Sequence, residues 1–264
     1  MGCGPASDVL GRGAMIATLM PSPTPGFALP FALPFALPLA LPFEVAPYRL
    51  SGLVVGALLN HAPALAALGD AVSQPPHKAP PSAPVLAIKP RNTLALHGST
   101  VMVPHGVAAL EIGASLGVVI GRTTCRVARA DAMRQVAGYV IVNDVSVPIT
   151  SHYRPSVRFK ARDGFCVFGP HVVAAGSISA PDALVVHVSV NGERVHRTDT
   201  SNRVRGVAQL IADVSDFMTL RPGDVLMLGV SAGAPLVGAG DSVAIAIDGL
   251  GELTCRLMAE GAGA

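Results

Sequence analysis

Tryptophan is absent from the sequence, and side chains that carry charge are scarce. Only 14% of the 264 residues are charged, against roughly a quarter in ordinary globular proteins, and the formal net charge is +2. Three tyrosines offer few rings on which bases could stack. These shortages argue against nucleic acid as a partner, because binding to phosphates needs clustered cations. Half of the residues are hydrophobic, which excludes a generally disordered chain.

Cysteine is sparse as well. The four cysteines follow no C-x-x-C spacing and lie at Cys3, Cys125, Cys166 and Cys255. A chain of this length does not need disulfides to fold, so we expect a reduced, cytoplasmic protein. The eight histidines lack the spacing of a metal site such as H-E-x-x-H, and no G-x-S-x-G motif of a nucleophilic enzyme is present.

Residues 1–46 have almost no charge but are rich in proline. The stretch 27–43 reads FALPFALPFALPLALPF and meets the minimum length of a membrane span. Its prolines recur every four residues, and each removes a helix donor at a cost of about 3 kcal/mol. They also interrupt the apolar core that a signal peptide needs. We therefore expect an irregular, partly polyproline-like extension and no membrane partner.

Glycine and proline are abundant in the chain, with 28 and 23 residues, which is too many for a helical bundle. After the extension, residues 47–84 have the pattern of a small N-terminal module: a strand, a short helix over 62–68 and a Pro-rich connector over 74–84. Residues 85–259 have the pattern of a larger, strand-rich domain. The sequence therefore predicts three segments, 1–46, 47–84 and 85–259.

Apolar patterns within 85–259 indicate an α+β fold rich in strands. They predict buried strands over 115–121 and 139–145 and a short helix over 129–136. Asn191-Gly192 between two alternating runs predicts a β-hairpin. A helix over 206–218 is predicted by apolar side chains at helical spacing, Val207, Leu210, Ile211, Val214 and Phe217. Together with three further strands after residue 224, these elements favour a curved or rolled sheet.

Cations gather in one segment, HYRPSVRFKARDGF. Arg154, Arg158, Lys160 and Arg162 fall within nine residues. If the segment is extended, alternation places all four on one face. Such a row suits a ligand with two or three carboxylates, because arginine binds carboxylate bidentately and lysine offers a point charge to an enolate. The alternative is an edge strand protected by basic residues.

Few acids and histidines stand out. Asp144 ends an apolar strand, where a carboxylate can hold a metal or a catalytic water, although aspartate at such a position more often caps a turn. Glu111 has no acidic neighbour two residues on, and we expect a solvated loop residue. His61 follows Asn60 at a predicted helix start, where capping or packing is the main expectation and ligand contact the alternative.

Eight sequence blocks occur in the order of a known family: LNH, IKPRNT, LGVVIGRT, VAGYVIVNDVS, FKARDGF, VNGE, TLRPGDVLMLG and AGDSVAIAIDGLGEL. In this order they resemble the fumarylacetoacetate hydrolase family over about residues 48–257. More narrowly, they resemble the N-terminal-type half of its isomerase/decarboxylases, which process ring-cleavage products of 4-hydroxyphenylacetate (homoprotocatechuate) with two homologous halves, fused or separate. The resemblance implies a rolled, mixed β-sheet with a small N-terminal module.

The resemblance also implies chemistry at a divalent metal, Mg²⁺ or Mn²⁺. In the family an E-x-E pair and the aspartate of an N-D pair hold the metal, which stabilises an enolate. Asp144 matches that aspartate, and Lys160 matches a lysine that assists electrostatically, so both are expected catalytic residues. The expected substrate-binding residues are Asn60, His61, Arg158 and Arg162.

Some positions depart from the family pattern. Gly113 and Ser115 stand where the two glutamates are expected, and the family's TGTP loop, which usually receives a substrate carboxylate, reads LGVS over 228–231. One carboxylate cannot hold Mg²⁺ tightly, because this ion asks for octahedral oxygen coordination. Asp144 is therefore a weak candidate metal ligand. The resemblance implies a role in the breakdown of 4-hydroxyphenylacetate, but the missing glutamates leave the mechanism open.

Three functions are compatible with these features. The leading one is a subunit of an isomerase/decarboxylase acting on 5-oxopent-3-ene-1,2,5-tricarboxylate and on 5-carboxymethyl-2-hydroxymuconate-type intermediates, as a homo-oligomer or with a metal-bearing paralogue. In a metal-free version, Arg158, Lys160 and Arg162 take the carboxylates and the enolate while Asp144 or a water moves protons. The second is a non-catalytic structural subunit. The third is an acylpyruvate-type hydrolase, against which the lack of an evident base argues.

Overall fold

The computed structural model describes residues 52–75, 78–149 and 157–261. The Pro-rich extension predicted over 1–46 lies outside these residues, so its irregular structure stays a prediction. No helix in the described ranges is both long and apolar enough to cross a membrane.

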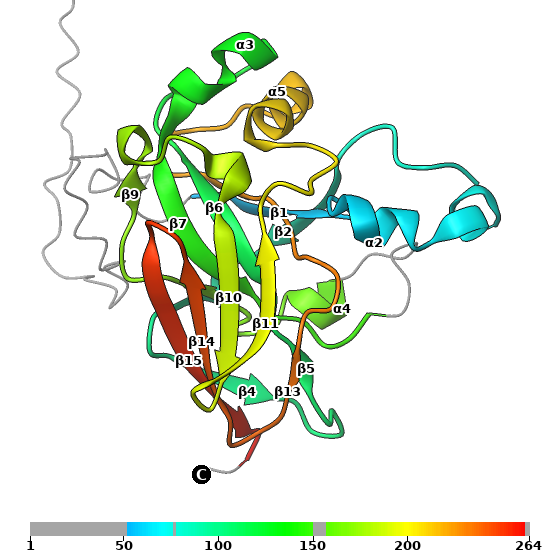
Figure 1. The fold of residues 1–264 in the computed structure, drawn as a ribbon, viewed down its shortest axis with the longest axis vertical. Coiled ribbons are helices and arrows are strands. Elements are labelled where there is room, and N and C mark those ends of the chain that lie inside the picture. The colour runs from blue at the N-terminus through cyan, green and yellow to red at the C-terminus, as the bar shows by residue number, and fades with distance from the viewer. Residues whose placement is uncertain (1–51, 76–77, 150–156, 262–264) are drawn as a thin grey trace, which may run out of the picture. The chain divides into compact units, whose positions relative to one another are not determined.

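A mixed sheet of eight strands forms the centre of the described structure (Figure 1). Its strands are β1 (Val54–Leu58), β2 (Val85–Lys89), β3 (Leu94–Leu96), β6 (Ala114–Ile120), β7 (Val136–Asp144), β8 (Cys166–Phe168), β9 (Val173–Ala174) and β12 (Val225–Met227). The order is β2-β1-β12-β6-β7-β8-β3, and β9 pairs with β7. β2 and β3 are the two ends of this order, yet only the short 3-10 turn Arg91–Thr93 separates them in the chain. The sheet must therefore roll to bring its ends together.

A second sheet has the order β11-β10-β14-β15-β4. Its strands are β4 (Thr100–Val103), β10 (Val185–Val190), β11 (Glu193–Asp199), β14 (Ser242–Ile247) and β15 (Gly251–Ala259). The predicted hairpin joins β10 to β11 through Asn191 and Gly192, whose φ angles of 51° and 84° are those of a type I′ turn. A two-stranded sheet pairs β5 (Leu110–Glu111) with β13 (Leu236–Val237).

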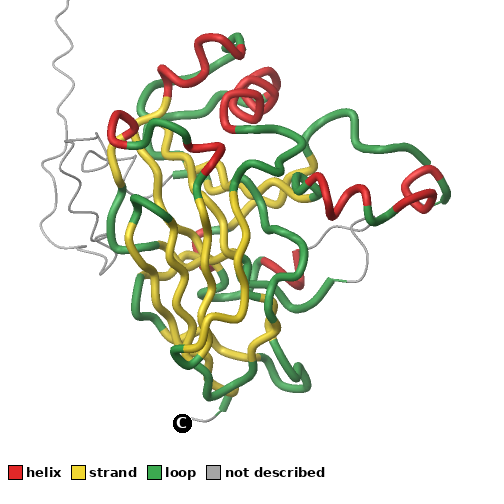
Figure 2. Tube along the Cα trace, viewed as in Figure 1, coloured by secondary structure: helices red, strands yellow, loops and turns green. Residues whose placement is uncertain are grey.

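The helices are short, as the red segments of Figure 2 show. They are α2 (Ala62–Ala66), α3 (Arg129–Ala132), α4 (Val157–Lys160) and α5 (Val207–Phe217). α2 and α3 end earlier than predicted, and each is followed by a 3-10 turn, Gly69–Ser73 and Met133–Gln135. α5 buries its predicted apolar face except for Phe217, which is 63% exposed.

The hydrophobic core has two parts. The larger part joins one face of β6 and β7 to β10, β14, β15 and α5 through residues such as Leu116, Ile141, Val188 and Ile245. The smaller part lies on the opposite face of β6 and β7, with Val119, Val140, Val142 and Met227. Because both faces of β6 and β7 are covered, these strands read as continuous apolar runs.

The predicted fold is confirmed: the chain is a strand-rich α+β protein with a rolled, mixed sheet. The boundary placed at residue 84 stays a prediction. β1 and β2, which lie on either side of it, pair with each other in the eight-stranded sheet.

The extended cationic row predicted around Lys160 is wrong. Residues 157–160 form the single turn α4, closed by a hydrogen bond from Ala161 N to Val157 O. Helical spacing turns alternate residues to different sides, so Lys160 is buried whereas Arg158 is exposed. Arg154, the fourth cation of the row, lies outside the described residues.

Candidate functional site

Asp144 lies at the end of β7, against the start of β6. Its backbone N–H donates to the carbonyl of Gly113 at 2.8 Å. The same antiparallel register pairs Ser115 with Val142 and Glu111 with Ser146. Since paired residues share a face, positions 111, 113 and 115 all lie on the face of the sheet that carries the Asp144 side chain.

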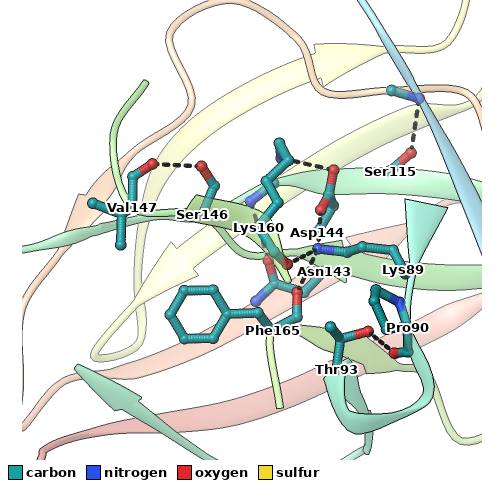
Figure 3. A network of polar contacts seen from close by, with 12 residues as sticks. Lys89, Pro90, Thr93, Ser115, Asn143, Asp144, Ser146, Val147, Lys160 and Phe165 are labelled. Carbon is teal, nitrogen blue, oxygen red and sulfur yellow. Dashed lines mark hydrogen bonds and ion pairs between the residues drawn. The ribbon is translucent and has the colours of Figure 1, made fainter. Parts of the chain in front are cut away.

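Two lysines enclose the carboxylate of Asp144 (Figure 3). Lys89 Nζ, at the end of β2, lies 2.6 Å from Asp144 Oδ1, and Lys160 Nζ, from α4, donates to Asp144 Oδ2 at 2.9 Å. All three side chains are at most 5% exposed. We call Lys89, Asp144 and Lys160 the Lys–Asp–Lys cluster; it carries one net positive charge.

The two lysines are not equivalent. Lys89 Nζ also donates to the carbonyls of Lys160, at 2.8 Å, and Phe165, at 3.1 Å, besides its ion pair with Asp144 (Figure 3). Within the described ranges, Asp144 is the one side chain or carbonyl to which Lys160 Nζ donates a hydrogen bond. Lys89 is therefore a structural tie between β2 and the segment after α4, whereas Lys160 keeps donors for a ligand.

Burial and charge oppose each other at Asp144. Burial would raise the pKa of this carboxyl, but Lys160 and Lys89 lower it, and the net direction of the pKa is down. Asp144 thus stays ionised at neutral pH. A carboxylate held between two ammonium groups is better suited to orienting them than to exchanging protons.

Glu111 lies beside the cluster, although we expected a solvated loop residue. It is half-buried on β5, on the face that Asp144 occupies. Burial raises the pKa of Glu111; nearby Lys160 opposes the rise and Asp144 adds to it, so that the net pKa is raised. A half-buried carboxyl with a raised pKa is the usual form of a proton carrier.

The residues at the family's metal position do not fit a divalent ion. A side chain at Gly113 would overlap the carbonyl oxygen of Asp144 and come within 2.8 Å of Val230 Cγ2. Ser115 Oγ accepts a hydrogen bond from Gly229 N at 3.1 Å. Both Asp144 oxygens face ammonium groups, which would repel a cation. The described residues contain no group of three His, Cys, Asp or Glu side chains arranged to hold a metal.

Asn60 and His61 hold the loop over 228–232. Asn60 Nδ2 donates to the carbonyls of Leu228 and Arg205, both at 2.9 Å, and its Oδ1 accepts from Arg205 N at 2.8 Å. His61 Nδ1 accepts from Ala232 N at 3.1 Å. Asn60 therefore has a structural role in the free protein. His61 precedes α2 and makes no cap hydrogen bond.

Arg158 and Arg162 lie outside the cluster. The Arg158 guanidinium is 5.3 Å from the centroid of the Phe159 ring, and Arg162 Nε donates to the carbonyl of Arg158 at 3.1 Å. Their role in substrate binding stays a prediction. Sequence reasoning missed Lys89, although IKPRNT was among the blocks that carried the resemblance. A lysine that directly follows the apolar run VLAI was the available signal.

The sequence profile described as fumarylacetoacetate (FAA) hydrolase C-terminal matches residues 53–258. The chain belongs to the fumarylacetoacetate hydrolase family. A curated relative, the 4-hydroxyphenylacetate degradation bifunctional isomerase/decarboxylase of Salmonella dublin, is 37% identical over 211 residues, which are 80% of this chain and 48% of the relative. The chain thus spans about half the length of that family member.

Solved structures of the fumarylacetoacetate hydrolase family share the fold. The 5-carboxymethyl-2-hydroxymuconate delta-isomerase from Mycobacterium smegmatis aligns with a TM-score of 0.67 and 28% identity, covering 79% of this chain and 77% of that one. The fumarylpyruvate hydrolase from Pseudomonas aeruginosa, in complex with Mn²⁺ and pyruvate, aligns with a TM-score of 0.65 and 27% identity, covering 79% and 89%. A divalent metal therefore occurs in the family.

Proposed function

We propose that this chain is a subunit of an isomerase/decarboxylase of aromatic catabolism, acting on 5-oxopent-3-ene-1,2,5-tricarboxylate and 5-carboxymethyl-2-hydroxymuconate-type intermediates. The observation that carries the proposal is the Lys–Asp–Lys cluster at the family's metal position, with Lys160 free to donate and Glu111 beside it. Similarity to the Salmonella dublin isomerase/decarboxylase supports the substrate class.

The cluster offers a metal-free way to stabilise an enolate. Isomerisation removes a proton from one carbon and returns it to another, and decarboxylation leaves an electron pair conjugated with a carbonyl; both pass through an enolate. Lys160 Nζ donates to that enolate oxygen, and the one net positive charge of the buried cluster opposes its negative charge. Asp144 and Lys89 hold Lys160 in position.

Glu111 is the proton carrier in this proposal. Of the four charged residues it alone is part-exposed, so it can exchange protons with solvent. Its raised pKa brings its two protonation states closer in energy, which suits a group that both takes and returns a proton. This assignment replaces Asp144 as the group that moves protons.

Two alternative functions make different predictions about Lys160 and about a metal. A non-catalytic subunit would need Lys160 only for folding. An acylpyruvate-type hydrolase, which the similarity to the Pseudomonas aeruginosa enzyme would suggest, needs a metal or a base that activates water. The poor fit of Gly113, Ser115 and the two lysines to a metal argues against the hydrolase.

The test follows the ultraviolet absorbance of 5-carboxymethyl-2-hydroxymuconate with the purified chain in EDTA. We expect turnover that Mn²⁺ does not increase and that Lys160→Met lowers about 100-fold, the effect of removing one oxyanion donor. Arg134→Met, at an exposed position, is the matched control and should retain wild-type turnover.

Two results would overturn the proposal. Turnover that requires Mn²⁺ would assign the chemistry to a metal that we exclude. If the chain is inactive alone, and its complex with a homologue bearing E-x-E works equally well with wild-type and Lys160→Met chains, the chain is a structural subunit.

A further inference from the structure

Arg203 is a largely buried cation without a matching anion. Its Nη2 donates to Ser231 Oγ at 3.1 Å and, at the long distance of 3.5 Å, to the carbonyl of Asp199. Its Nε and Nη1 are buried and have no hydrogen-bond partner among the described residues. Within the same residues, no carboxylate forms an ion pair with it. Burial lowers the pKa of Arg203 to about 10, and the more distant Asp199 and Asp182 only partly offset that effect.

His61 lies against this cation and has one defined tautomer. Backbone hydrogen bonds pair its strand segment with that of Arg203, from Ala62 N to Asn202 O and from Val204 N to Asn60 O, both at 2.9 Å. Because Nδ1 accepts the Ala232 N–H, the neutral ring carries its proton on Nε2. His61 Nε2 has no partner in the described part of the chain, and it is not among the buried unpaired atoms. It is therefore a free N–H donor beside Arg203.

Burial, together with Arg203, favours the neutral form of His61. Burial, Arg203 and His196 lower the pKa of His61, while Asp199 raises it, and the net direction is down. Asp199 is engaged elsewhere, since its Oδ1 accepts from Ser201 N at 2.9 Å and from Ser201 Oγ. His61 thus offers a neutral donor, and Arg203 places a positive charge near it.

One loop connects His61 and Arg203 to the surroundings of the Lys–Asp–Lys cluster. Gly229 N donates to Ser115 Oγ, and Val230 lies against Gly113, which contacts Asp144 through the backbone. The next residue, Ser231, accepts from Arg203, and Ala232 donates to His61. Residues 229–232 therefore contact both sites, an arrangement that allows a single substrate bearing carboxylates at both ends to reach both.

We propose that His61 and Arg203 form a second anion site, in which His61 Nε2–H donates to a distal carboxylate of the substrate and the buried Arg203 supplies the positive charge. This inference deepens the proposed function by naming the residues that select a polycarboxylate. Arg203 acts through its charge and through Ser231, without direct contact, because its unpaired nitrogens are covered. It is thus a positioning residue.

The test uses propane-1,2,3-tricarboxylate, an inert tricarboxylate, so that binding is measured without turnover. Calorimetric titration at constant ionic strength should show saturable binding to the wild-type chain and about tenfold weaker binding to Arg203→Met, the loss of 1.4 kcal/mol. Arg203→Lys should retain most of the affinity. Arg197→Met, at an exposed position on the preceding strand β11, is the matched control and should bind like the wild type.

Nitrogen NMR of the histidine rings gives a readout that a merely structural Arg203 would not move. In the wild type, His61 should carry its proton on Nε2, and that signal should shift on adding the tricarboxylate. In Arg203→Met, the pKa of His61 should rise, because a nearby positive charge is lost.

Three outcomes would overturn the inference: no saturable binding by the wild-type chain, wild-type affinity in Arg203→Met, or a His61 ring protonated on Nδ1. The wild-type spectrum decides the last point even if Arg203→Met fails to fold. Absence of turnover with Arg203-dependent binding intact would refute the proposed function alone.

Discussion

Lys89 shows how one buried side chain determines the character of the site. The fully buried ammonium group of Lys89 lies beside Asp144, the residue that the family resemblance matches to a metal ligand. Lys89 and Lys160 compensate a carboxylate that would otherwise be costly to bury. The negative charge of Asp144 in turn reduces the repulsion between the two buried ammonium groups.

We predict that Lys89→Met lowers the free energy of unfolding by about 3–5 kcal/mol, because it removes one partner of a buried ion pair and leaves two carbonyls without a donor. Urea denaturation measures this change. Arg134→Met, which removes an exposed ion pair with Asp131, should change stability by less than about 1 kcal/mol. Equal effects of the two substitutions would mean that the Lys89 pair is solvated.

Glu111 should make the stability of the folded protein depend on pH. The raised pKa means that the folded protein holds this proton at pH values where the unfolded chain has lost it, so the contribution to stability falls as pH rises above the ordinary value of 4.5. Glu111→Gln cannot ionise. We therefore predict that it is more stable than the wild type at pH 7 and that this advantage disappears toward pH 4.

Urea denaturation of both proteins from pH 4 to 8 checks this prediction. Glu193→Gln, at an exposed position in the β10–β11 hairpin, is the control and should follow the wild type throughout. A Glu111→Gln protein that is less stable than the wild type at pH 7 would show that folding stabilises the ionised carboxylate, which contradicts a raised pKa at Glu111.

At the scale of elements, the close approach of β6 to β7 shapes the site. The backbone at Gly113 lies directly against Asp144, with no room for a side chain. The segment where the family pattern places metal ligands, residues 113–115, packs closely against Asp144 in this chain and offers no carboxylate. Its Ser115 hydroxyl anchors the loop over 228–232 instead.

Gly113→Ala should therefore lower the free energy of unfolding by about 1–3 kcal/mol, the usual cost of overpacking a core. Gly176→Ala is a matched control, because a methyl group there meets no atom within 4 Å and its φ is not positive. Thermal unfolding of the two variants measures the difference. A Gly113→Ala protein as stable as Gly176→Ala would mean that β6 and β7 separate easily and that the position can take a larger side chain.

The sequence predicted those elements whose pattern is local. β6, β7, α5 and the Asn191-Gly192 hairpin follow from apolar periodicity and from one turn dipeptide, and all four are present. The extended conformation on which the cationic row depended is absent at α4, because four residues are too few to distinguish a period of 3.6 from a period of 2.

The site was only partly predictable, because its members meet through sheet register and rolling. Asp144 and Lys160 came from the family resemblance, and they do lie together. Lys89 and Glu111 reach Asp144 from β2 and β5, whose pairing is decided by contacts distant in sequence. Arg203 was missed because a lack of partners is visible only in three dimensions.

At the scale of the whole molecule, the chain corresponds to about half of the Salmonella dublin isomerase/decarboxylase. If a partner of this chain carries an intact E-x-E, the two would divide the work between a metal site and a metal-free site. In our proposal, two positive centres, the Lys–Asp–Lys cluster and the pair of His61 and Arg203, supply the charge that holds a polycarboxylate.

The claim that the Lys–Asp–Lys cluster takes the place of the metal has one direct test, calorimetric titration of Mn²⁺ into the purified chain near pH 7. We predict no site tighter than about millimolar, because one carboxylate already paired with two ammonium groups cannot replace the oxygen ligands that such an ion requires. A one-to-one site of about micromolar affinity, lost in Asp144→Asn, would contradict this claim and show that Glu111 and Asp144 leave the lysines to bind a metal.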